Sequence, residues 1–279
     1  MPSSARYDFV ETDSRLSRIF TLDDVGACVT GDESERTNMR ELRGSLELLW
    51  EDAWELNRQS MISLLDPGIE TLLDCGCDDG EFTERVALSV KAGRAMGIEI
   101  DEVKAEKAMA RGIEVIIGDL NHEFKLEDSF VDGAIANQVI EHLCNTDNLL
   151  SEIWRVLKPG GILVLSTENL ASWHNILALL LGWQPFSLTN ISEHHMGIGN
   201  PLSLHRGEKG IPKPSQHLRI FTIRSLVELL ENQGFEIEQL LGIGYFPFKG
   251  KTARVLSKVD PRHSALITIK CRKPKSNPQ

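Results

Sequence analysis

Leu72-Leu73-Asp74-Cys75-Gly76-Cys77-Asp78-Asp79-Gly80-Glu81-Phe82-Thr83 is the stretch of the chain that decides its fold. It opens with an apolar run typical of a buried strand and continues, after two glycines, into residues with helical spacing. Gly76 and Gly80 let the backbone pass close to a ligand without an intervening side chain, and the helix that follows begins with free N–H groups. The stretch therefore predicts a strand, a turn that fits a nucleotide-like ligand, and a helix.

The rest of the chain repeats this alternation of strand and helix. Runs of strand type occur at residues 70–75, 95–100, 114–117, 133–137 and 162–166. Stretches with helical spacing occur at residues 83–91, 103–111, 148–157 and 223–233. Two closing strands, 235–240 and 265–271, have no long helix predicted between them and indicate an antiparallel hairpin at the edge. The predicted fold class is α/β, a doubly wound, mostly parallel seven-stranded sheet (Rossmann-like) with an antiparallel edge strand and helices on both faces.

Two regions interrupt the alternation. Residues 1–40 are polar and acidic, and residues 42–65 carry apolar side chains at near-helical spacing, so we expect residues 1–60 to form an N-terminal helical extension. The main domain is expected at 61–273, followed by a tail at 274–279. Within it, the Gly-, Pro- and His-rich region 170–215 is expected to form an inserted cap or lid.

Composition argues against several classes of partner. The 279-residue chain is 41% hydrophobic, which is enough for a substantial core, and its formal net charge of −11 argues against a nucleic-acid partner. Its five cysteines lack the paired spacing of a zinc site or a disulfide framework. The apolar run at 176–183 is shorter than the roughly 20 residues of a membrane span. We therefore expect a cytoplasmic protein without a membrane span, and the sequence does not predict its oligomeric state.

An acidic residue lies at the end of each of the first three strands: Asp74, Glu99 and Asp119. Glu99 lies 25 residues after Asp74, where nucleotide-binding sheets place an acid that accepts hydrogen bonds from ribose hydroxyls. Asp101 is instead expected to cap the next helix. Since ligands bind outside the carboxyl ends of parallel strands, the three acids together predict a binding site at that edge.

On these residues the chain resembles the class I S-adenosylmethionine-dependent methyltransferases, and in particular their ubiquinone-type group. The family pattern D/E-x-G-x-G-x-G is matched by Asp74, Gly76 and Gly80, with Asp78 in place of the middle glycine. Residues 132–143 resemble the family's fourth strand and the segment after it, and residues 155–161 match its R-x-L-K-P-G-G turn. The similarity is strong over residues 60–168 and weaker over 216–272.

The resemblance implies S-adenosylmethionine as the cofactor. In the family, the first acid holds the ammonium of the methionine moiety, the second accepts the ribose hydroxyls, and the third meets the adenine amino group. The fourth strand ends beside the methionine moiety. The cofactor-binding residues implied in this chain are Asp74, Gly76, Cys77, Gly80, Glu99, Ile100, Asp119, Leu120, Asn137 and Gln138.

His142 is the candidate catalytic residue, because it follows the fourth strand at the ligand-binding edge. It is either a base that removes a proton from the acceptor or a hydrogen-bonded histidine that fixes its own segment. A base is optional, because a sulfonium methyl is already a strong electrophile and the protein mainly has to align the nucleophile. The cap region is rich in histidine, but no pair there has the i, i+4 spacing of helical metal ligands, so no metal site is predicted.

The expected methyl acceptor is a small molecule or a glycan- or lipid-linked compound, modified at a hydroxyl. This follows from the resemblance and from apolar and aromatic cap residues such as Trp173, Trp183 and Phe186, which would equally serve to bury the cap. Two alternatives stay open: a non-catalytic scaffold or regulator that binds S-adenosylmethionine, and a nicotinamide dehydrogenase. The dehydrogenase is disfavoured because residues 76–80 do not fit G-x-G-x-x-G.

Overall fold

The computed structural model describes residues 33–192, 194–204, 206 and 216–275. Residues 43–279 form one compact unit, and the fold described below is that of this unit. Most of the expected N-terminal extension, residues 1–32, lies outside the described residues. Among the described helices, none is long and apolar enough to cross a membrane.

A seven-stranded sheet forms the centre of the unit, in the order β3-β2-β1-β4-β5-β7-β6. β1 to β5 pair in parallel, whereas β7 is antiparallel to both of its neighbours, β5 and β6. This confirms the predicted fold class. The order of strands reverses between β1 and β4, which is where sheets of this kind bind ligands. The strands are β1 (Thr71–Cys75), β2 (Arg94–Glu99), β3 (Glu114–Ile117), β4 (Val131–Asn137), β5 (Leu157–Glu168), β6 (Glu236–Ile243) and β7 (Leu266–Arg272).

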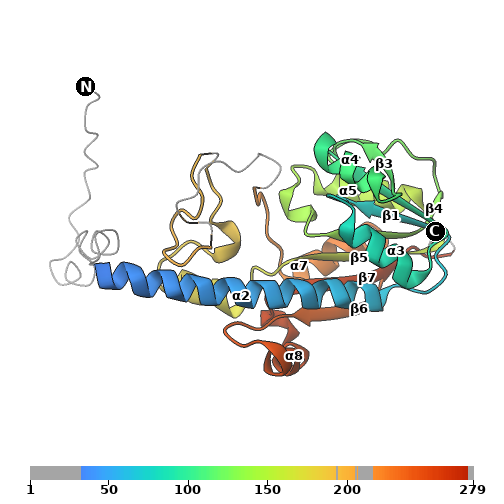
Figure 1. The fold of residues 1–279 in the computed structure, drawn as a ribbon. Helices are drawn as coiled ribbons and strands as arrows, with labels where there is room; N and C mark the ends of the chain where they lie inside the picture. Colours follow the sequence, from blue (N-terminus) through green and yellow to red (C-terminus); the bar gives the residue numbers. More distant parts are fainter. Residues whose placement is uncertain (1–32, 193, 205, 207–215, 276–279) are drawn as a thin grey trace, which may run out of the picture. The chain divides into compact units, whose positions relative to one another are not determined.

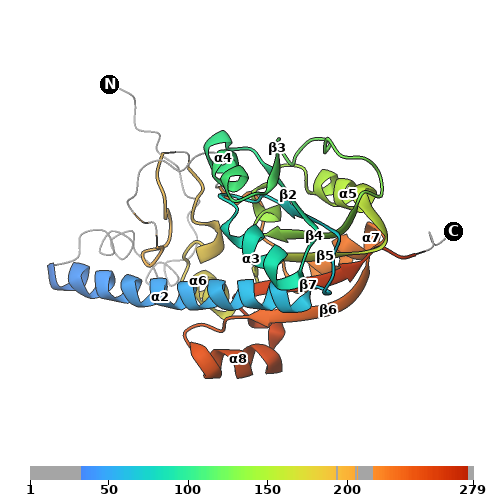
Figure 2. The ribbon, with the colours of Figure 1, turned by 45° about the vertical axis from the view of Figure 1, so that its right-hand side comes forward.

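Helices cover both faces of the sheet (Figures 1 and 2). Leu72 of β1 packs in one hydrophobic cluster with Met61 and Val86, whereas Leu73 packs in another with Leu149. Successive side chains of a strand point to opposite faces, so these two leucines anchor a different helical layer each. Complete burial of one such side chain contributes about 1.5–3 kcal/mol to the stability of the folded state. The helices are α2 (Glu33–Leu64), α3 (Glu81–Val90), α4 (Glu102–Ala110), α5 (Thr146–Val156), α6 (Trp173–Leu180), α7 (Ile223–Asn232) and α8 (Gly250–Val259).

The helix α2 continues through the boundary that we expected at residue 60. Its buried Asn57 donates from Nδ2 to Oδ1 of Asn137 at 2.9 Å. The Asn57 oxygen accepts hydrogen bonds from the hydroxyls of Ser166 and Thr268, at 2.8 and 2.7 Å. One side chain thus ties α2 to β4, β5 and β7, and it fixes the helix at the carboxyl end of β4.

The two closing strands are antiparallel neighbours, as expected, but they do not form a simple hairpin. The ten-residue helix α8 and a 3-10 turn, Pro261–His263, lie between them. The expectation that no long helix separates the strands was wrong. The reason is that α8 buries only the small side chains Ala253 and Ser257, whereas its larger residues Val255 and Val259 are exposed, so the pattern does not mark a face packed on the sheet.

Candidate functional site

A cavity of about 730 Å³, the first cavity, lies at the carboxyl edge of β1 to β4. All of the predicted site residues except Gly80 line it. Gly80 precedes α3 with φ 80°, and a Cβ there would lie 2.6 Å from Cδ1 of Ile113 and 2.9 Å from Cβ of Ala108. Gly80 therefore lets α3 pack closely against its neighbours instead of facing the cavity.

The turn after β1 has the backbone shape that its glycines predict. Gly76 has φ 84°, and a Cβ at this position would lie 2.6 Å from Cγ2 of Val139. The N–H groups of Gly76 and Cys77 both donate to the carbonyl of Ile98, at 2.9 and 3.2 Å, so they hold the turn against β2. Asp78 also has positive φ, 50°, a conformation that Asp tolerates better than most residues.

Asp74 presents a carboxylate to the first cavity with little support from the protein. One oxygen accepts a 2.6 Å hydrogen bond from the Thr83 hydroxyl, and the other has no hydrogen-bond partner among the described residues. Burial raises the pKa of Asp74 to about 7, and the neighbouring carboxylates of Glu99 and Asp78 add to the effect. A cation in the cavity would give the second Asp74 oxygen a partner and would stabilise the buried negative charge.

The Glu99 carboxylate is held in place by backbone donors. One oxygen accepts from the N–H of Asp78 at 2.9 Å, and the other accepts from Ile100 and Asp101 at 3.0 and 2.9 Å. A carboxylate has about four lone-pair positions, so roughly one stays free for a hydroxyl of a ligand. Asp101 itself caps α4 by accepting from the N–H groups of Val103 and Lys104, which confirms its predicted role.

Asp119 lies at the far end of the same cavity. Its Oδ1 accepts from the backbone N–H and the side-chain amide of Asn121, at 2.9 and 2.8 Å. The buried Leu120 and the half-exposed Ile100 add apolar surface to the wall. This end therefore offers an acceptor next to apolar side chains, which suits a heteroaromatic ring with an amino group.

A second cavity, of about 270 Å³, adjoins the first and shares Arg58, Asn137, Gln138 and His142 with it. Gln138 has φ 55°, and its N–H donates to the carbonyl of Ser166 at 2.9 Å. This bend carries the chain from β4 past both cavities. The remaining residues that line the second cavity are Trp54, Asn57, Glu141, Glu168 and His217.

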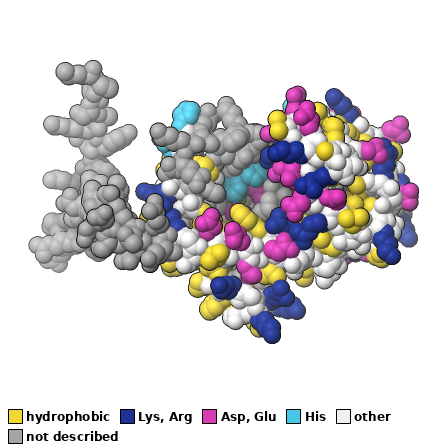
Figure 3. Space-filling model, in the orientation of Figure 1, with side chains coloured by type: hydrophobic (Ala, Val, Ile, Leu, Met, Phe, Trp, Pro, Cys, Tyr) yellow, Lys and Arg dark blue, Asp and Glu magenta, His cyan; other side chains and the backbone are white. Residues whose placement is uncertain are grey.

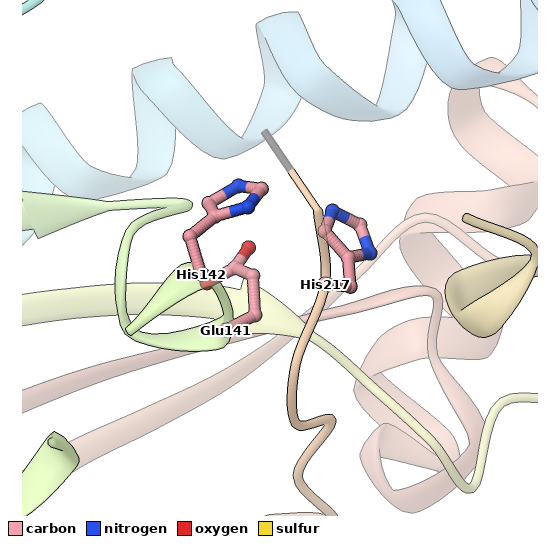
Figure 4. A group of neighbouring side chains, drawn as sticks. All are labelled: Glu141, His142 and His217. Carbon is pink, nitrogen blue, oxygen red and sulfur yellow. The ribbon is translucent and has the colours of Figure 1, made fainter. Parts of the chain in front are cut away.

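Glu141, His142 and His217 converge beside the second cavity (Figure 4). Nδ1 of His142 lies 3.1 Å from the carbonyl oxygen of Gln216, and Nδ1 of His217 lies 2.7 Å from that of Ser187. A carbonyl only accepts, so each Nδ1 carries the hydrogen, and in a neutral ring the lone pair is on Nε2. The ring centroids are 4.8 Å apart.

The electrostatics of this group differ from residue to residue. Burial, assisted by the nearby His217, lowers the pKa of His142 to about 4. Burial also disfavours the charged form of His217, but the carboxylates of Glu168 and Glu141 outweigh it and raise its pKa. Burial raises the pKa of Glu141 to about 7. At neutral pH, His142 is thus an uncharged imidazole with an available lone pair.

The same three side chains have the donor set of a metal site. One ligand atom from each of Glu141, His142 and His217 lies within 4.8 Å of the others. Two imidazoles and a carboxylate suit a divalent transition metal. Ligand spacing along one helix does not indicate this arrangement, because His217 comes from a segment 75 residues after His142. The absence of a metal stays a prediction.

Two other site residues were also missed. Arg58 and Trp54 of α2 line the second cavity, and Arg58 lines the first as well. Their only sequence signal is a polar and an aromatic residue four positions apart on one helix face. Of the histidines in the region 170–215, the partly buried His174 packs among aromatic rings, and this desolvation lowers its pKa to about 3, whereas His194 and His195 are exposed.

Comparisons with known proteins agree with this geometry. A family model described as a methyltransferase domain matches residues 34–240. The chain belongs to this family. It is 30% identical over 200 residues to a probable S-adenosylmethionine-dependent methyltransferase of Mycolicibacterium smegmatis, covering 70% of this chain and 61% of the relative. It is 26% identical over 186 residues to the ubiquinone biosynthesis O-methyltransferase of Rattus norvegicus, covering 64% and 48%. The chain thus spans about half to three fifths of the length of these relatives.

Solved structures show the same fold. An S-adenosylmethionine-dependent methyltransferase of Thermotoga maritima superposes with a TM-score of 0.53 at 19% identity, over 81% of this chain and 91% of that one. An S-adenosylmethionine-dependent methyltransferase of Methanosarcina mazei superposes with a TM-score of 0.53 at 20% identity, over 77% of this chain and 96% of that one. Family membership makes S-adenosylmethionine the cofactor and decides against the nicotinamide dehydrogenase.

Proposed function

We propose that the protein transfers the methyl group of S-adenosylmethionine to a hydroxyl of a small-molecule, glycan or lipid-type acceptor held in the second cavity. The observation that carries this proposal is that the two cavities adjoin and share His142. A methyl donor in the first cavity would face an acceptor in the second across the end of β4.

The first cavity offers a matching group for each part of the methyl donor. Asp74 would pair with the ammonium and Arg58 with the carboxylate of the methionine moiety, because each supplies the opposite charge. Glu99 would accept a ribose hydroxyl, and Asp119 the adenine amino group. These assignments rest on the positions of the side chains around one cavity and on the chemistry of the ligand.

His142 is the base in the proposed reaction. The acceptor oxygen attacks the methyl carbon, the bond from that carbon to sulfur breaks, and sulfur keeps the electron pair as S-adenosylhomocysteine forms. The hydroxyl proton passes to Nε2 of His142, whose Nδ1–H is held by the carbonyl of Gln216. A weak base suffices because the hydroxyl becomes more acidic as its oxygen donates electrons.

The experiment compares wild type with His142→Asn for S-adenosylhomocysteine binding by calorimetry and for methyl transfer to a panel of phenols, saccharides and polyprenyl alcohols. We expect the variant to bind the ligand normally and to lose about 10²–10⁴-fold in turnover. Unchanged turnover would refute the base. Binding without turnover by the wild type on every acceptor would favour the scaffold alternative.

The division of the chain into an extension, a main domain and a cap, and the cytoplasmic location, stay predictions. Truncation before Arg43, followed by thermal unfolding and ligand binding, would test the first of these. The described helix α2 supplies Trp54 and Arg58 to the cavities, so truncation beyond residue 58 should abolish ligand binding.

A further inference from the structure

The surface around α8 concentrates positive charge on an otherwise acidic protein. Between Phe248 and His263 the chain has one acidic residue and five basic ones, a formal charge of +4 in a chain of −11. Asp260 is the acid, and it pairs with His263 at 2.7 Å. Within the described part of the chain, no carboxylate lies in ion-pair range of Lys249, Lys251, Arg254 or Lys258. The fifth basic residue, Arg262, lies 3.8 Å from Asp260. The basic residues are Lys249, Lys251, Arg254, Lys258 and Arg262.

The outward face of α8 mixes these cations with apolar side chains. α8 buries Ala253 and Ser257 against the sheet, so Lys251, Val255 and Lys258 follow one another along the opposite face. Val255 is 60% exposed and Val259, at the end of the helix, is 77% exposed. A helix that faces only water carries polar residues at such positions.

The cap adjoins this surface and adds apolar area to it. The Trp173 ring at the start of α6 lies 4.5 Å from the His263 ring, and its Nε1 donates to the Tyr245 hydroxyl at 2.7 Å. Leu177 and Leu180 of α6 are 57% and 79% exposed. Figure 3 shows dark-blue cationic groups next to yellow apolar ones at the lower end of the molecule, over α8.

We propose that α8 and its flanking residues dock the protein on the surface of an anionic lipid bilayer. The lysines and arginines would lie among the headgroups, and Val255, Val259 and Phe248 would enter the interface between headgroups and acyl chains. Charge complementarity supports this occupant: the patch has the sign that anionic lipids attract, whereas the rest of the chain repels them.

The apolar component distinguishes a bilayer from other anionic partners. A nucleic acid is held by cations on its phosphates and offers no apolar layer for exposed valines and leucines. A bilayer satisfies both kinds of side chain at once, and no membrane-crossing helix is required. Docking there would bring the cap close to the lipid phase, and the inference does not depend on the proposed methyl transfer.

The test is flotation of the purified full chain with vesicles of phosphatidylcholine alone or with 30 mol% phosphatidylglycerol, in 0.1 and 0.5 M salt. We expect binding to the anionic vesicles only, weakened by salt. The triple variant Lys251→Glu, Arg254→Glu and Lys258→Glu should lose at least about a hundredfold in affinity, since each cation near the surface contributes about fivefold and each glutamate adds repulsion. The double variant Val255→Ser and Val259→Ser should bind the anionic vesicles more weakly than the wild type, but its binding should depend on salt as the wild type's does.

A matched control makes the same charge change at the exposed Lys107, Lys125 and Lys275, and it should bind vesicles as the wild type does. All variants should keep the wild-type melting temperature and affinity for S-adenosylhomocysteine, which shows that they are folded and separates docking from the proposed function. Wild type that does not float with anionic vesicles in 0.1 M salt would overturn the proposal, and an acidic protein surface would then be the better partner. Equal losses in the two triple variants would also overturn it.

Discussion

Replacing Asp74 by Asn should stabilise the protein without ligand while it weakens the binding of S-adenosylmethionine. The pKa of this buried carboxyl is raised from 3.8 to about 7, chiefly by burial. In the folded state Asp74 therefore binds a proton more tightly than in the unfolded state, and the free energy of unfolding falls as pH rises from about 4 to about 7. The full effect corresponds to about 4 kcal/mol, because each tenfold change in proton affinity is worth about 1.4 kcal/mol.

Asn keeps an oxygen that accepts from the Thr83 hydroxyl and removes the charge. The stability of Asp74→Asn relative to wild type should therefore rise by about 2.5–3 kcal/mol between pH 5 and pH 8. Denaturant unfolding without ligand at several pH values measures this difference directly. Glu141 is buried with a raised pKa as well, but it is common to both proteins and cancels in the comparison.

The same variant should bind S-adenosylmethionine about 10–150-fold more weakly, because a charge-assisted hydrogen bond to the ammonium contributes about 1.5–3 kcal/mol. Calorimetry at pH 8 measures the loss. Asp101→Asn is the matched control: the same exchange at an exposed helix cap, where Asn serves as well as Asp. A stability difference that stays constant from pH 5 to pH 8, or an affinity within threefold of wild type, would refute the role assigned to Asp74.

Three further predictions concern the turn, the helix α2 and the base. Gly76→Ala should lower the free energy of unfolding by about 1–3 kcal/mol in denaturant titrations, because it adds a Cβ at positive φ against Val139, and Val139→Ala should restore part of the loss. Asn57→Leu should lower the free energy of unfolding by about 2–4 kcal/mol in the same assay, since the buried hydroxyls of Ser166 and Thr268 and the half-buried Asn137 amide each lose a hydrogen bond. Because the pKa of His142 is about 4, kcat at saturating cofactor should be flat from pH 6 to pH 9 and fall below about pH 5. Turnover should also survive dialysis against EDTA. If EDTA abolishes turnover and zinc restores it, His142 acts as a metal ligand and not as the base.

The parts of the fold that could be predicted from the sequence are those determined by short segments. β1 is an uninterrupted buried run, and Gly76 ends it with a backbone conformation that few other residues adopt. Asp74, Glu99 and Asp119 lie at strand ends, and parallel pairing brings strand ends together without further information. Local pattern and global topology agree here, so a short stretch of sequence was sufficient.

The parts that were missed depend on contacts between distant segments. α8 buries only small side chains and leaves Val255 and Val259 exposed, so its apolar residues do not mark a face packed on the sheet. His217 lies next to His142 because residues 216–219 pack beside the end of β4, where Leu218 and Arg219 donate to the carbonyl of Glu141 at 2.8 and 3.2 Å. No spacing rule within one helix or strand connects residues brought together in this way.

This contrast separates the two halves of the site. Asp74, Glu99 and Asp119 come from consecutive strand ends and line the first cavity, where we propose that the cofactor binds, and the sequence pattern alone predicts their proximity. Trp54 comes from the helix before the sheet and His217 from the segment before α7, and they meet only in the folded chain. Since part of the second cavity comes from segments outside the shared sheet motifs, the acceptor has to be inferred from the side chains of the cavity. The two imidazoles, the two carboxylates and one exposed indole favour an acceptor with a hydroxyl next to a flat or apolar face.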